Sequence, residues 1–139
     1  MGFREKSNWI MFVTLSLVGG RHFGPLGLRV INGDTAPGDL GRDFATLALL
    51  VVFIAVPAHI AVAALDPDES DAADERDKLI ETRADARSSY VIGAGALWSI
   101  GLAYYGADVY WVANAALAGL VIGEIVKGLL RAVDYRRGV

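Results

Sequence analysis

Several ionisable residues interrupt long apolar stretches of the chain, and three of them are candidates for function. His59 lies within the apolar run 44–65, and Glu124 and Lys127 lie within the run 110–132. Ionisable groups at bilayer depth are costly, so they are default candidates for function. Counted from the predicted outer ends of the two runs, His59 and Glu124 both lie roughly 21–23 Å inward. This shared depth allows a hydrogen bond between them, and such a pair is suited to moving protons or cations.

A structural interpretation of the same residues stays open. Glu124 and Lys127 form an i,i+3 pair, and with Arg131 they fit side chains that extend toward the cytoplasmic headgroups. The charge pattern favours this anchoring role. Ion handling and contact with a partner protein are the two alternatives.

A second group of candidates lies in the charged segment 66–87, whose acidic residues precede its basic ones. This order suits a helix dipole, so the segment predicts a short amphipathic helix that begins near Asp71 and leads into the next apolar run. Before it, the sequence Asp66-Pro67-Asp68 ends the preceding helix. The candidates for partner contact are Asp74, Glu75, Arg76 and Asp77, and Leu79 and Ile80 add a small apolar patch for the bundle or a partner.

The sequence gives little support for catalysis or for binding of a metal or haem. The chain has no cysteine, and it contains no nucleophile–base pair, phosphate-binding glycine loop or HExxH motif. A haem held by His22 and His59 is disfavoured because their depths differ by roughly 10 Å. A calcium loop starting at Asp66 has Asp71 where glycine is needed. We therefore expect no enzymatic activity, no cofactor and no bound metal.

The elements that position these residues are four apolar blocks. Of the 139 residues, 54% are hydrophobic and the mean hydropathy is +0.41, whereas most of the charge lies between the blocks. Because a helix needs about 20 apolar residues to cross a bilayer, we predict one transmembrane domain, residues 1–139, with spans at 8–26, 44–65, 88–105 and 110–132. A net charge of −3 without a separate basic tract argues against nucleic-acid binding.

The first block allows two interpretations. A basic start and a short apolar run also describe a signal peptide, but no small-residue cleavage site follows the run. The sequence favours an uncleaved span, with Gly19-Gly20-Arg21-His22 marking the end or a break of its helix.

The distribution of Lys and Arg predicts the orientation. Nine of them lie in the N-terminal tail, the segment 66–87 and the C-terminal end, against three on the opposite side. The positive-inside rule therefore places both termini in the cytoplasm. The fold expected is an all-α integral membrane four-helix bundle.

Small residues recur at i+4 spacing in three of the predicted spans. The series are Ala55, His59 and Ala63; Gly95, Ser99 and Ala103; and Ala115, Gly119 and Gly123. Such series let helices approach closely, so they predict a compact bundle or a homo-oligomer.

Two further residues of the predicted spans carry structural predictions. Pro57 predicts a bend or a moving hinge, and Asn114 predicts a hydrogen bond between helices.

Three short motifs resemble a group of small four-span bacterial predicted membrane proteins. They are Glu5-Lys6-Ser7-Asn8-Trp9, Asp74-Glu75-Arg76-Asp77-x-x-Ile80 and Trp111-x-x-Asn114. The resemblance covers most of the chain, is weakest over residues 20–43 and departs from the group at Gly19-Gly20. Members have no established activity, so the resemblance implies the topology, the bacterial inner membrane and a role for residues 74–77 beyond solubility.

From these observations we expect a non-enzymatic inner-membrane protein, an accessory or partner-binding subunit acting through its charged cytoplasmic segment. The lipid bilayer surrounds it, and it belongs to a homo-oligomer or a larger membrane complex. The alternative is a small oligomeric proton or cation transporter or channel using His59 and Glu124.

Overall fold

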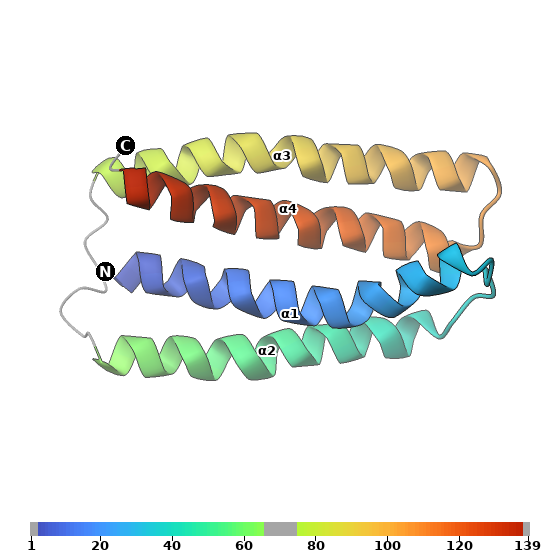
Figure 1. The fold of residues 1–139 in the computed structure, drawn as a ribbon, viewed down its shortest axis with the longest axis horizontal. Coiled ribbons are helices and arrows are strands. Elements are labelled where there is room, and N and C mark those ends of the chain that lie inside the picture. Colours follow the sequence, from blue (N-terminus) through green and yellow to red (C-terminus); the bar gives the residue numbers. More distant parts are fainter. Residues whose placement is uncertain (1–2, 66–74, 138–139) are drawn as a thin grey trace.

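The computed structural model describes residues 3–65 and 75–137, which form four helices (Figure 1). The helices are α1 (Phe3–Ile31), α2 (Leu40–Leu65), α3 (Glu75–Tyr104) and α4 (Val109–Arg137). Within these two ranges the chain contains no strand. The protein is therefore all-α with four helices, as predicted, and successive helices run in opposite directions.

Two of the four helices are long and apolar enough to cross a membrane. They cover Leu40–Ala64 and Val109–Arg137, with mean hydropathies of 2.6 and 1.7 in their most apolar windows. In α1, Arg21 and Arg29 interrupt the apolar sequence, and the first half of α3 is rich in charged residues. That α1 and α3 also span the membrane stays a prediction.

Helix α1 continues through the sequence that we expected to break it. Gly19, Gly20, Arg21 and His22 all lie within the helix, which runs on to Ile31. The prediction of a break or end at this point is wrong. Gly19 packs closely on α4, since a β-carbon there would lie 2.9 Å from Cγ1 of Val121, whereas a β-carbon on Gly20 would meet no atom within 4 Å.

Helix α3 joins the charged segment and the third apolar run into one element of 30 residues. Ile80 is 1% exposed and Leu79 is 46% exposed, so the apolar pair divides between the interior and the surface. The predicted end of the second helix at Asp66-Pro67-Asp68, the cap at Asp71 and the candidate Asp74 lie outside the described residues.

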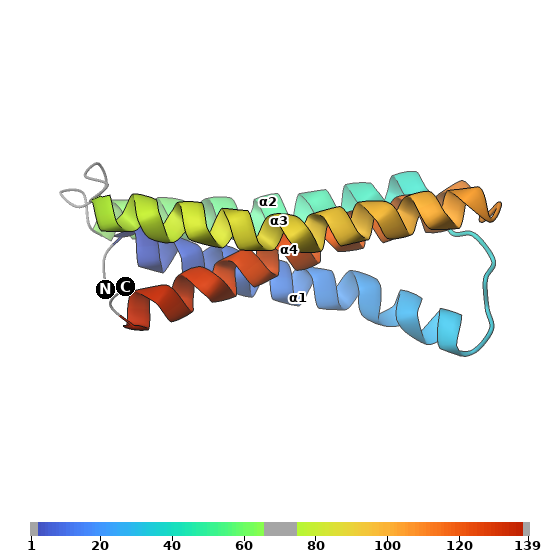
Figure 2. The same ribbon diagram turned by 90° about the horizontal axis from the view of Figure 1, so that it is seen from above.

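The helices form an open row instead of a compact bundle. Helix α2 packs on α1, α1 on α4, and α4 on α3, and the last pair is the most extensive. Figure 1 shows this order across the molecule, and Figure 2 shows α1 and α4 crossing and then diverging. Because α2 and α3 lie at opposite sides of the row, the expected compact bundle is not formed within one chain.

Glycines bring α3 and α4 into direct backbone contact. A β-carbon on Gly119 would lie 2.7 Å from Cα of Gly95, and one on Gly123 would overlap the side chain of Ile92. Farther along α4, a β-carbon on Gly128 would lie 3.1 Å from Cβ of Phe12 in α1. Close approach at Gly95 and Gly119 is confirmed, although Ala63 and Ala103 of the predicted series are exposed.

Candidate functional site

The strongest concentration of charge lies where α1 begins and α4 ends. We call six side chains from three helices the interhelical charge cluster: Arg4, Asp77, Glu81, Asp85, Lys127 and Arg131. Helical periodicity places the acids of α3 at 77, 81 and 85 on one face, opposite the bases of α4 at 127 and 131. The cluster therefore joins α3 to α4 by opposite charges.

Its shortest contacts link these two helices. Nζ of Lys127 lies 2.7 Å from Oδ1 of Asp85. Nη2 of Arg131 donates to Oε1 of Glu81 at 2.8 Å and to Oδ1 of Asp85 at 3.3 Å. The side chains of Lys127 and Arg131 are 22% and 21% exposed, whereas those of Asp85 and Glu81 are both 47% exposed, so water reaches the acidic side of these pairs.

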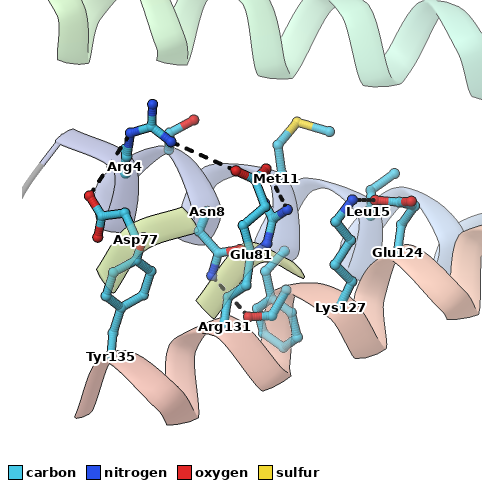
Figure 3. A pocket seen from close by; sticks show the side chains of 13 residues that line it. Arg4, Asn8, Met11, Leu15, Asp77, Glu81, Glu124, Lys127, Arg131 and Tyr135 are labelled. Atoms are coloured by element: carbon cyan, nitrogen blue, oxygen red, sulfur yellow. Dashed lines mark hydrogen bonds and ion pairs between the residues drawn. The ribbon is translucent and has the colours of Figure 1, made fainter. Parts of the chain in front are cut away.

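Helix α1 reaches the same cluster from the other side (Figure 3). The guanidinium of Arg4 lies 4.0 Å from the carboxylate of Asp77 and 3.8 Å from that of Glu81. One turn farther, Nδ2 of Asn8 donates to the carbonyl oxygen of Gly128 at 2.9 Å. Asn8 is buried, so the bond satisfies a polar group that would be costly to leave unpaired.

A cavity of about 320 Å³ opens between these helices. Its wall combines Glu124 and all members of the cluster except Asp85 with the apolar side chains of Met11 and Leu15, which Figure 3 places farther along α1. Tyr135, beyond the predicted span 110–132, also lines it. Each cation of the cluster already faces a carboxylate, so the cavity offers little net charge to an incoming ion.

His59 is held by α1 and by its own helix. Its Nδ1 lies 2.7 Å from the carbonyl oxygen of Ala55, and its Nε2 lies 2.8 Å from Oγ of Ser7. A carbonyl only accepts, so Nδ1 carries a proton and donates it to Ala55, while Nε2 and the serine hydroxyl share the second hydrogen bond. The hydrogen bond between His59 and Glu124 that their shared depth allows is not formed, because both ring nitrogens of His59 are bonded to Ser7 and Ala55.

Glu124 is not hydrogen-bonded to His59, and it lines the first cavity beside Lys127 (Figure 3). Its side chain is 48% exposed, and its carboxylate lies 3.9 Å from Nζ of Lys127. The i,i+3 pair predicted from the sequence is therefore present, but Lys127 makes its short contact with Asp85. The structure does not bring the residues of the expected ion-handling pair together.

The other predicted contact residues are divided between surface and interior. Glu75 is exposed, and Nη2 of Arg76 lies 3.4 Å from the carbonyl oxygen of Tyr135. Asp77 belongs to the interhelical charge cluster. Asp74 lies outside the described residues. Across residues 3–65 and 75–137, no group of three or more His, Cys, Asp or Glu side chains is placed to hold a metal ion.

The opposite end of the molecule has its own polar links, which sequence reasoning found only in part. Nε2 of His22 lies 2.9 Å from Oδ1 of Asn114, which confirms the predicted interhelical bond of this asparagine. The hydroxyl of Tyr110 donates to Asp43 at 2.8 Å, and Nε1 of Trp111 donates to the carbonyl oxygen of Thr35 at 2.7 Å. The aromatic pair at the start of α4 was the available signal, since amphipathic rings gather at interfaces.

Fold and site together define a class: a four-helix all-α protein with polar links between its helices and many large apolar side chains on its outside. No protein-family model matches the chain, and neither a curated protein nor a solved structure is significantly similar to it.

Proposed function

We propose that the chain is a polytopic inner-membrane protein with four spans and both termini in the cytoplasm. One observation carries this proposal: only 11% of the most apolar 18-residue stretch of α2 is buried within the chain. The core helix of a soluble protein would bury such a surface against its neighbours, whereas a lipid-facing helix leaves it outside. Phe53, for example, is 72% exposed near the middle of α2.

The distribution of polar groups supports spans for α1 and α3 as well. Thr14 of α1 and Ser99 of α3 are buried, while Leu17 and Trp98, on the same two helices, are 64% and 69% exposed. Lipid offers no hydrogen-bond partners, so helices in a bilayer turn polar side chains toward one another. This arrangement fits four helices that lie side by side in the membrane.

The activity that we propose is non-enzymatic: an accessory subunit that docks a protein partner at the cytoplasmic end of α3. The acids of α3 that take part in the interhelical charge cluster point inward. On its outer face, Glu75, Lys78, Leu79 and Arg83 are exposed. Mixed charges around one apolar side chain suit a protein contact, because charge complementarity there supplies specificity.

The membrane part predicts a defined labelling pattern. Since the chain has no native cysteine, single Lys78→Cys and Tyr105→Cys variants each carry one thiol, at opposite ends of α3. In intact cells we expect a membrane-impermeant maleimide to label Cys at 105 and to label Cys at 78 only after lysis, with both chains resisting alkaline extraction. Release by alkali, or labelling of position 78 in intact cells, would overturn the proposed topology.

The docking part predicts a crosslink confined to one end. A photo-crosslinking amino acid at Arg83 should give one discrete adduct with another protein in cell membranes, and the same group at Tyr105 should not. Both positions are exposed, so Tyr105 is the matched control. If Lys78, Leu79 and Arg83 all give no protein adduct in a chain that resists alkaline extraction, the docking role is wrong.

A further inference from the structure

A second cavity, of about 730 Å³, lies between α1 and α2 at the end away from the interhelical charge cluster. Three arginines line it, Arg21 and Arg29 from α1 and Arg42 from α2, against a single acid, Asp43. We call it the arginine groove. Its volume lies within the roughly 300–1,000 Å³ that is usual for small-molecule sites.

The charges of the arginine groove are not neutralised as those of the first cavity are. Arg29 is bound to Asp34 at 2.8 Å and to the carbonyl oxygen of Ala36 at 2.6 Å. Asp43 accepts the hydroxyl of Tyr110. Within residues 3–65 and 75–137, no acceptor pairs with the guanidinium of Arg21 or of Arg42. Two cations are therefore left to face this cavity without a partner.

The rest of the groove wall is apolar. Val18 and Leu26 of α1 and Leu47 and Leu50 of α2 line it together with the arginines. Arg21 lies ten residues before Ile31, the last residue of α1, so its α-carbon is roughly 15 Å along the helix axis from that end. An arginine at such a position extends its guanidinium toward the headgroup level, and its stem lies against apolar surface.

We propose that the arginine groove binds the phosphate of an anionic phospholipid of the outer leaflet. The planar guanidinium matches a phosphate in bidentate geometry, and basic pockets between membrane helices favour anionic headgroups. Arg21 and Arg42 hold the phosphate, and an acyl chain lies along Val18, Leu47 and Leu50. The inference rests on the proposed membrane location, because only a bilayer supplies this ligand at that depth.

The test uses the full chain purified in a maltoside detergent and dihexanoyl phosphatidylglycerol as the probe. Native mass spectrometry should show the lipid bound, with affinity at least tenfold weaker in an Arg21→Gln/Arg42→Gln variant. Arg83→Gln, which removes an exposed arginine of α3 far from the groove, is the control and should bind normally. If the double variant does not fold, Arg21→Lys serves instead. Lysine keeps the positive charge but cannot bind the phosphate in bidentate geometry, so this variant should bind the lipid several-fold more weakly.

Two further probes separate the sources of the interaction. Dihexanoyl phosphatidylcholine, whose choline group balances the charge of its phosphate, should bind at least tenfold more weakly than phosphatidylglycerol. Inorganic phosphate should also bind more weakly, because it cannot use the apolar wall. Equal binding of both lipids, equal binding of free phosphate, or unchanged binding by the arginine variants would each overturn the assignment. These results are obtained in detergent, so they are independent of the alkaline extraction that tests the membrane location.

Discussion

Replacing Gly119 by leucine should separate α3 from α4 and lower the free energy of unfolding by about 3 kcal/mol, near the upper end for an overpacked core. The reason is geometric. A β-carbon at this position would lie 2.7 Å from Cα of Gly95, and backbone cannot move aside as a flexible side chain can. Since α3 and α4 form the most extensive helix pair, their separation should affect the whole fold.

Alanine at the same position provides a more demanding test. In an unconstrained helix, replacement of glycine by alanine stabilises by roughly 0.5–1 kcal/mol. Gly93→Ala should show this gain, because a β-carbon on that residue of α3 would meet no neighbouring atom within 4 Å. Gly119→Ala should instead lower the unfolding midpoint in detergent. Equal shifts in the two variants would mean that the glycine contact is not needed for packing.

Much of this contact could be predicted from the sequence, and the reason is local. Close approach of helices in lipid requires small residues at regular spacing, so the positions Gly95 and Gly119 carry the information themselves. Most of the helix from Leu40 to Leu65 was predictable for a similar reason, since residues 44–65 contain no Asp, Glu, Lys or Arg and an apolar run of this length has few other stable conformations. Both features depend on the residue types within one segment.

The contacts of His59 could not be predicted because they depend on which helices are neighbours. Depth along a helix follows from residue counting, and it placed His59 level with Glu124. It does not say which helix lies beside α2, and the answer is α1, which presents Ser7. The same limit explains Gly19, which was predicted to mark a break in its helix but instead packs on Val121 of α4.

The interhelical charge cluster was missed for a related reason. Lys127 and Arg131 fit side chains that extend to headgroups, and the acids of α3 fit a solvated helix surface. Each interpretation was reasonable for one helix taken alone. Only the antiparallel pairing of α3 with α4 places Glu81 and Asp85 opposite these two bases and turns two ordinary charge patterns into one contact.

Reversal of one charge should therefore damage the fold at this end. We expect Arg131→Glu to lower the free energy of unfolding by about 1.5–3 kcal/mol, the range for hydrogen bonds to charged groups. The new carboxylate would face Glu81 and Asp85, which now accept hydrogen bonds from Arg131 at 2.8 and 3.3 Å. Unfolding in detergent, followed by circular dichroism, measures the change.

The same charge reversal at Arg83 is the control. Arg83 is exposed on α3, and a substitution on an open surface should change stability by no more than about 0.5 kcal/mol. A compensating Glu81→Arg in the Arg131→Glu chain should restore part of the lost stability by forming the pair in the opposite sense. Restoration should be incomplete, because Arg4, now 3.8 Å from the carboxylate of Glu81, would face a like charge. If Arg131→Glu is no more harmful than Arg83→Glu, the cluster is a surface feature and α3 is held to α4 by its glycines alone.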